Sequence, residues 1–232
     1  MVRWFQGAAS GLMLLLLAGP SGAQVNLGWN DTGPSGYHFR QYDCAGNDGE
    51  ETMVASFVAP AGVTQLVRLE AVIDFCSGGL PFPDWWKFNS CRLGALTATT
   101  VLGPDQYQYV DYWEGRGNPS ATFIQQDVNL GRIVVDIQIP PESATPLTEG
   151  VHYYAFVLKI DHSGTTGPEA CAGCDSGLCF VLNDVRLIWP EGETRLHGSG
   201  INMVVWQQDL VGCPFVVPVV PTTWGGIKAL VD

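Results

Sequence analysis

The sequence predicts an all-β domain: an antiparallel β-sandwich of the jelly-roll or immunoglobulin-like kind, stapled by disulfides and ending in a short helix. About eight segments alternate apolar and polar residues with a period of two, and Gly, Pro, Asp or Asn turn signals bound them. No sustained helical pattern lies between these segments. Seven cysteines follow an N-terminal export signal, which indicates that disulfides form in an oxidising compartment.

The N-terminal residues 1–23 have the three zones of a cleavable signal peptide. Arg3 supplies the positive charge, a leucine-rich run follows, and the small residues 21–23 form the cleavage site. The apolar run is too short to cross a hydrocarbon core of about 30 Å as a helix. We expect a mature chain that begins at Gln24 and forms a single β-sandwich domain over residues 24–232. It is expected to be secreted, either extracellular or periplasmic, without a membrane span.

The predicted strands follow one another along the mature chain. The second of them alternates most regularly, with Val67, Leu69, Ala71, Ile73 and Phe75 facing the core and Arg68, Glu70 and Asp74 facing water. The fifth does the same, with Ile133, Val135, Ile137 and Ile139 facing inward. The predicted strands are 52–58, 65–75, 93–101, 107–113, 130–139, 151–160, 179–189 and 201–207.

Only two segments have helical character. Asp84 is positioned to cap a single turn over residues 85–88. Near the C-terminus, Thr223 is positioned to cap a helix over residues 223–231, whose apolar residues would pack on the sandwich.

The charge of the chain limits its partners. The formal net charge is −12, and removal of Arg3 with the signal peptide makes it −13. Such an acidic surface repels phosphate backbones, which argues against nucleic acid and anionic membranes as partners. The many aromatic and apolar residues distinguish the chain from a disordered acidic tail, so we expect a folded domain.

The cysteines predict a specific set of bridges. A Cys76–Cys91 bridge would close a short loop and contribute about 3 kcal/mol in the chain-entropy model. The four cysteines Cys171, Cys174, Cys179 and Cys213 are expected to form two further bridges, which leaves one of the seven over. Two alternatives remain open for the Cys171–Cys174 pair: a zinc site completed by another cysteine or a histidine, and a redox site.

Aromatic residues provide the best candidate for a ligand-binding surface. Flat rings beside Asp, Asn or Glu suit sugars, which present apolar faces and polar edges. A loop closed by a disulfide would also lose less entropy on binding. The alternative is that these rings are ordinary core residues. The candidates are Trp85, Trp86, Tyr109, Tyr112 and Trp113, with Tyr107 beside them.

Acidic residues suggest two other kinds of site. Calcium is a possible ligand of the turn that contains Asp43, Asn47, Asp48, Glu50 and Glu51, although a solvated turn is the simpler interpretation. Otherwise no cofactor and no metal site are predicted. Carboxylate pairs, Asp111 with Glu114 or Asp74 with Asp136, would suit hydrolysis of a glycosidic bond if they met in a cleft.

Four phrases give the chain a resemblance to a group of uncharacterised secreted bacterial proteins. They are VNLGWNDTG, MVASFVAPAGVTQLV, ACAGC and TTWGGIKAL. The resemblance implies a signal peptide and paired cysteines, but no activity or binding residues. In that group a cysteine often follows the Asn-Asp pair, where Thr32 stands here. This departure implies that Cys44 is the free thiol.

Together these features favour a secreted non-catalytic module that binds carbohydrate or belongs to a surface assembly. Extracellular polysaccharide or other envelope proteins would be its partners. The alternative is a secreted hydrolase that acts on polysaccharide through a carboxylate pair.

Overall fold

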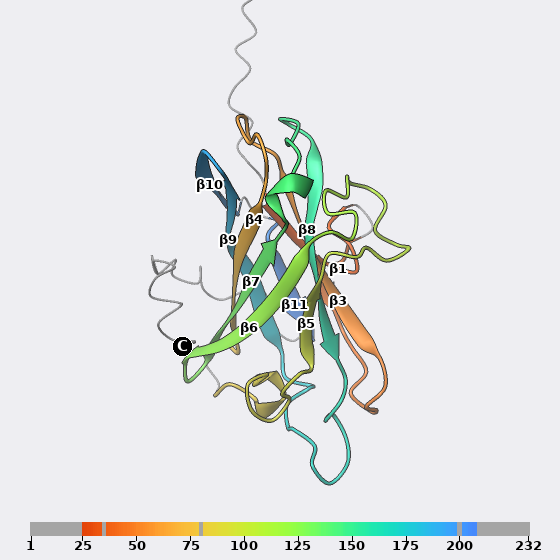
Figure 1. Cartoon of the computed structure of the whole chain (residues 1–232). Coiled ribbons are helices and arrows are strands. Elements are labelled where there is room, and N and C mark those ends of the chain that lie inside the picture. Colours follow the sequence, from red (N-terminus) through yellow and green to blue (C-terminus); the bar gives the residue numbers. More distant parts are fainter. Residues whose placement is uncertain (1–24, 34–35, 79–80, 199–200, 208–232) are drawn as a thin grey trace, which may run out of the picture.

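The computed structural model describes residues 25–33, 36–78, 81–198 and 201–207, which form a β-sandwich of two sheets (Figure 1). The four-stranded sheet has the order β1 (Val25–Trp29), β3 (Glu50–Val58), β8 (His152–Asp161) and β5 (Leu96–Thr99). The seven-stranded sheet has the order β2 (Phe39–Arg40), β11 (Met203–Trp206), β9 (Leu178–Trp189), β4 (Arg68–Cys76), β7 (Leu130–Gln138) and β6 (Asn118–Asp127), with β10 (Gly192–His197) paired to β9. The strands pair antiparallel apart from the short β2–β11 contact, which is parallel.

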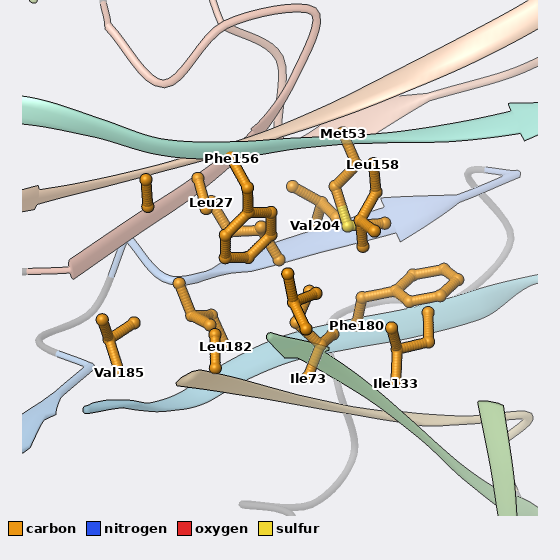
Figure 2. Close-up of a cluster of buried hydrophobic side chains, with 14 of the residues drawn as sticks. Leu27, Met53, Ile73, Ile133, Phe156, Leu158, Phe180, Leu182, Val185 and Val204 are labelled. Atoms are coloured by element: carbon orange, nitrogen blue, oxygen red, sulfur yellow. The ribbon is translucent and has the colours of Figure 1, made fainter. Parts of the chain in front are cut away.

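The core lies between the two sheets. Figure 2 shows how Leu27, Met53 and Phe156 of the four-stranded sheet face Ile73 and Phe180 of the seven-stranded one. These side chains are fully buried, and each contributes about 1.5–3 kcal/mol through removal of apolar surface from water. The alternation predicted for residues 65–75 and 130–139 places the expected residues in this core, apart from Val67, which is only partly buried.

The predicted strands are largely confirmed, with one error. The structure has strands in seven of the eight predicted segments, whereas residues 107–113 form a loop that pairs only at Val110, on the backbone of β8. Asp111 explains the difference, because its Oδ1 accepts hydrogen bonds from the backbone N–H groups of Trp113 and Glu114 and so turns the chain. The sequence interpretation also missed β1, β2, β6 and β10.

A bulge in β8 determines which side chains face outward from the four-stranded sheet. Ser56 of β3 lies opposite Tyr154 and Ala55 lies opposite Phe156, so Ala155 has no partner in the register. Ala155 and Phe156 consequently both face the core, while Tyr154 faces the outer side. The Ala155 carbonyl instead accepts a 2.7 Å hydrogen bond from Trp113 Nε1.

The outer face of the seven-stranded sheet is more buried than the sequence indicates. Glu70 and Asp74 were expected to face water, yet both are buried. Arg132 forms a two-pronged ion pair with Asp74 at 2.6 and 2.9 Å, and Glu70 pairs with Arg68 and Arg186. Burial raises the pKa of the Glu70 carboxyl, and the two arginines oppose that rise. Charge pairing therefore replaces hydration at these positions.

The disulfides differ from the predicted pairing. Cys44 pairs with Cys174 and Cys91 pairs with Cys171, so the predicted free thiol at Cys44 is wrong. Two bridges confined to Cys171, Cys174, Cys179 and Cys213 are excluded as well, because Cys171 and Cys174 pair with cysteines outside that group. With both sulfurs oxidised, neither a zinc site nor a dithiol redox site remains at the Cys171–Cys174 pair.

Strand register explains why the predicted Cys76–Cys91 bridge does not form. Cys76 is the last residue of β4 and lies opposite Cys179 of β9, in a small cluster apart from the main core. Cys179 is itself disulfide-bonded, whereas Cys76 is the buried free thiol of the described residues. Each bridge that is present closes a long loop, of 130 and 80 residues. Such loops give about 4 to 5 kcal/mol each in the chain-entropy model.

Three expectations fall on other parts of the chain. The signal peptide at 1–23, the C-terminal helix at 223–231 and Cys213 lie outside the described residues. Within the described part, the structure has no helix that is long and apolar enough to cross a bilayer.

Candidate functional site

Four of the five aromatic candidates belong to the core. Trp85 and Trp86 are 0% exposed, Trp113 is 1% exposed and Tyr112 is 5% exposed. A buried ring has no free face for a sugar, so the prediction of a binding surface at these four positions is wrong. Only Tyr109 among the five keeps a partly exposed ring.

The tryptophan pair closes one region of the core. Trp85 and Trp86 form the short 3-10 turn η1 (Asp84–Trp86), for which Pro83 rather than Asp84 is the capping position. The Arg92 guanidinium lies 3.4 Å from the centre of a Trp85 ring and donates a hydrogen bond to the Trp85 carbonyl. Burial lowers the pKa of Arg92 to about 10. These contacts give the turn a structural role, because they hold its two buried tryptophans in the core.

Tyr109 covers polar side chains on the outer face of the four-stranded sheet. Its ring stacks on His152 with centroids 3.6 Å apart, and it also packs on Tyr154. His152 Nε2 is 2.8 Å from Ser56 Oγ, and burial lowers the pKa of the imidazole although Asp31 acts in the opposite direction. Ser56 is 0% exposed, so this Ser–His contact is closed to a substrate.

A pocket beside Tyr109 combines exposed rings with acidic side chains. It has a volume of about 250 Å³ and is lined by Asn30, Asp31, Tyr37, Asp105 and Tyr107. Tyr107 is 76% exposed and Tyr37 is 54% exposed, so both rings are available to a ligand. We call this the tyrosine pocket. Its two aromatic faces and its carboxyl and amide groups are the combination that the sequence interpretation sought around Trp85.

Asp31 is held firmly at the tyrosine pocket. Its Oδ1 accepts hydrogen bonds from the Thr32 N–H at 2.7 Å and from the Tyr154 hydroxyl at 3.0 Å. The backbone fits tightly as well, because a Cβ on either Gly28 or Gly36 would overlap the Asp31 carbonyl oxygen. Burial, together with Asp31, raises the pKa of the Tyr154 hydroxyl, which therefore stays protonated as a donor to the carboxylate.

The backbone at Asn30 is in an uncommon conformation. Asn30 has φ of 65°, in the left-handed region that non-glycine residues seldom occupy. Gln106 holds the Asn30 carbonyl through a hydrogen bond from its Nε2, and its Oε1 accepts a hydrogen bond from the Gly103 N–H. The loop that carries Asp105 and Tyr107 is therefore tied to the turn after β1, which pre-organises the two halves of the pocket. Figure 1 shows the loop after β5 in yellow-green beside this sheet.

A second concavity lies next to the tyrosine pocket, on the outer face of the four-stranded sheet. It has a volume of about 340 Å³, and Asp105 lines both spaces. The strands contribute Glu50, Thr52, Thr99, Val157 and Lys159, and the loop contributes Val101, Leu102, Gly103, Pro104, Asp105 and Gln106. We call this the Lys159 groove.

The carboxylate pairs suggested for hydrolysis have structural roles. The Asp111 carboxylate accepts a hydrogen bond from the Trp113 N–H and so stabilises the turn there. The Glu114 carboxylate instead pairs with Arg116 at 3.5 Å. The other pair, Asp74 and Asp136, consists of two carboxylates that bind different arginines. Neither pair forms the free acid and base that glycosidic hydrolysis requires.

Three of the five side chains suggested for calcium form other contacts. Asn47 Oδ1 accepts hydrogen bonds from the N–H groups of Thr165 and Thr166, and Glu50 pairs with Lys159 at 2.8 Å. Asp43 accepts a hydrogen bond from the Ala45 N–H. Within the described ranges, the structure has no group of three His, Cys, Asp or Glu side chains arranged to hold a metal.

Sequence reasoning missed most of the tyrosine pocket. Tyr107 was named beside the aromatic candidates, but Tyr37, Asn30, Asp31 and Asp105 were not. A signal was present in the Gly-rich stretch around Asn30 and Asp31, since closely spaced glycines mark a tight backbone approach. That stretch contacts the loop around Gln106, which lies 76 residues after Asn30. Such a contact depends on tertiary folding, which local patterns do not encode.

Comparisons with known proteins give a distant structural likeness only. No protein-family model matches the chain, and no curated protein matches it. The cohesin module of a family 33 glycoside hydrolase from Clostridium perfringens is similar in structure with a TM-score of 0.35 and 7% identity, over 80% of this chain and 96% of that chain. The sixth cohesin of Acetivibrio cellulolyticus scaffoldin B, solved with a Cel5 dockerin, has a TM-score of 0.32 and 7% identity, over 82% of this chain and 100% of that chain. The second type II cohesin of ScaA from the same organism has a TM-score of 0.33 and 11% identity, over 88% and 97%.

Proposed function

We propose that this protein is a secreted, non-catalytic carbohydrate-binding module and that the tyrosine pocket is its binding site. The observation that carries the proposal is the pair of exposed rings, Tyr37 and Tyr107, that line a pocket together with acidic and amide side chains. Apolar C–H faces of a sugar ring stack on such tyrosines, while sugar hydroxyl groups donate to the exposed Asp105 carboxylate and to the Asn30 amide oxygen. Asp31 is 1% exposed and therefore shapes the pocket without offering its carboxylate to a ligand.

Pre-organisation supports a binding role. Asp31 is fixed by two hydrogen bonds, and Gln106 ties the loop to the Asn30 turn. A site that is ordered before the ligand arrives loses less entropy when it binds. Export is supported by the disulfides, because such bridges persist outside the reducing cytoplasm.

Affinity electrophoresis tests the proposal. The exported protein is run through gels that contain neutral polysaccharides, such as β-glucan, xylan or galactomannan, or anionic ones, such as polygalacturonate. We expect at least one neutral polysaccharide to retard the protein. Substitution of Tyr37→Ala or Tyr107→Ala should weaken binding at least tenfold, which corresponds to about 1.4 kcal/mol.

The matched control is Phe39→Ala, which removes an exposed aromatic ring outside the pocket. It should leave retardation unchanged. Absence of retardation in every gel, or equal retardation of the tyrosine variants, would contradict the proposal. Release of new reducing ends from a retained polysaccharide would favour the hydrolase alternative instead.

A further inference from the structure

We infer that the ligand is an uncharged glycan chain that extends from the tyrosine pocket along the Lys159 groove. The inference rests on the proposed function and adds a second subsite to it. Its first support is adjacency: Asp105 lines both the pocket and the groove, so the two spaces lie next to each other.

The direction of the groove suits an extended chain. Thr52 of β3 lies opposite Lys159 of β8, and Val157 of β8 lies opposite Thr99 of β5, so the floor crosses neighbouring strands. Strands lie about 4.8 Å apart, and a path over β3, β8 and β5, the three strands that line the groove, therefore measures about 10 Å. That length exceeds one sugar ring.

The floor of the groove has the chemistry that sugar hydroxyls require. Thr52 and Thr99 bring hydroxyl groups, and Lys159, whose side chain is 37% exposed, brings an ammonium that pairs with Glu50 at 2.8 Å. Hydroxyl groups donate and accept, while the ammonium only donates. The apolar wall at Val101 and Leu102 gives contact to C–H groups.

The charges of the protein favour an uncharged glycan over an acidic one. Of the two acidic residues that line the pocket, Asp105 is exposed and Asp31 is buried, and Glu50 offsets the single positive charge of Lys159 in the groove. The protein as a whole carries a formal net charge of −12. A uronate or sulfate group would therefore meet repulsion at close range as well as from the whole surface.

The test measures how affinity depends on ligand length. Neutral oligosaccharides of increasing length, prepared from the polysaccharide that retards the protein most, are titrated calorimetrically into the wild-type protein and the variant Lys159→Ala. We expect the wild-type affinity to rise about tenfold or more as the ligand grows beyond the tyrosine pocket, a difference of about 1.4 kcal/mol. Lys159→Ala should lose most of this gain and bind the shortest ligand as the wild type does.

Lys87→Ala is the matched control, because Lys87 also forms a 2.7 Å surface ion pair, with Asp84, but lies outside the groove. It should keep the length dependence. An affinity that does not depend on length, or equal losses in the two lysine variants, would overturn the groove inference while leaving the tyrosine pocket intact. Failure of every oligosaccharide to bind would instead overturn the proposed function. Tighter binding of an acidic oligosaccharide than of its neutral counterpart would refute the charge argument.

Discussion

Trp113 should be a structural residue whose removal destabilises the fold strongly. Its ring is 1% exposed, and its Nε1 donates to the carbonyl of Ala155, the extra residue of the β8 bulge. Truncation of a buried tryptophan to alanine costs about 3–5 kcal/mol, and a buried carbonyl left without its donor adds about 1–3 kcal/mol. We therefore expect Trp113→Ala to lower the free energy of unfolding by about 4 to 8 kcal/mol, against a typical total of about 5–15 kcal/mol.

Urea unfolding under non-reducing conditions measures this change. Trp113→Phe separates most of the two contributions, because it keeps most of the ring volume and removes the N–H donor. That variant should lose about 1–3 kcal/mol. Tyr107→Ala is the exposed control and should stay within about 0.5 kcal/mol of the wild type. A loss below about 1 kcal/mol for Trp113→Ala would refute the assignment of this ring to the core.

Three further predictions concern buried groups. The Cys76 thiol, at 2% exposed, should react with an alkylating reagent only after denaturation, and rapid labelling of the native protein would contradict its burial. Asp74→Ala leaves the buried Arg132 without its ion pair and should cost about 3–5 kcal/mol in urea unfolding, whereas the double variant Asp74→Leu/Arg132→Met should recover much of the loss. Burial lowers the pKa of His152 and His162, so the unfolded chain takes up these protons first and stability should fall as the pH drops below about 6.5. The double variant with both histidines changed to Gln should lose most of this dependence of the free energy of unfolding on pH between about pH 7 and 5.5. Buried carboxyls act in the opposite direction, but they are present in both proteins and so do not account for the difference. An unchanged pH dependence would contradict its origin in these imidazoles.

The fold class was predictable because burial of one sheet face imposes a period of two. In β4 and β7, apolar residues recur at every second position, and the structure places them on the core face. β6 escaped notice because it is an edge strand with few buried side chains. Residues 107–113 alternate as a strand would, but the Asp111 turn outweighs that pattern.

The candidate site was less predictable, since aromatic residues look alike in sequence whether they face ligand or core. Trp85 and Trp113 are the largest rings near the predicted loops, and large rings gain most from burial. The exposed partners, Tyr37 and Tyr107, come from segments that are distant in sequence and that tertiary contacts such as the Gln106 hydrogen bond bring together. The disulfide pairing failed for the same reason, because close cysteines in sequence were preferred over partners brought together by folding.

The most direct test of the carbohydrate-binding site is backbone amide chemical-shift mapping during titration with the neutral oligosaccharide that binds best. The account predicts that the perturbed amides cluster around Tyr37, Asp105 and Tyr107, while the indole N–H signals of Trp85 and Trp113 do not move. Perturbations centred on those buried tryptophans, or no perturbation at any ligand concentration, would contradict it.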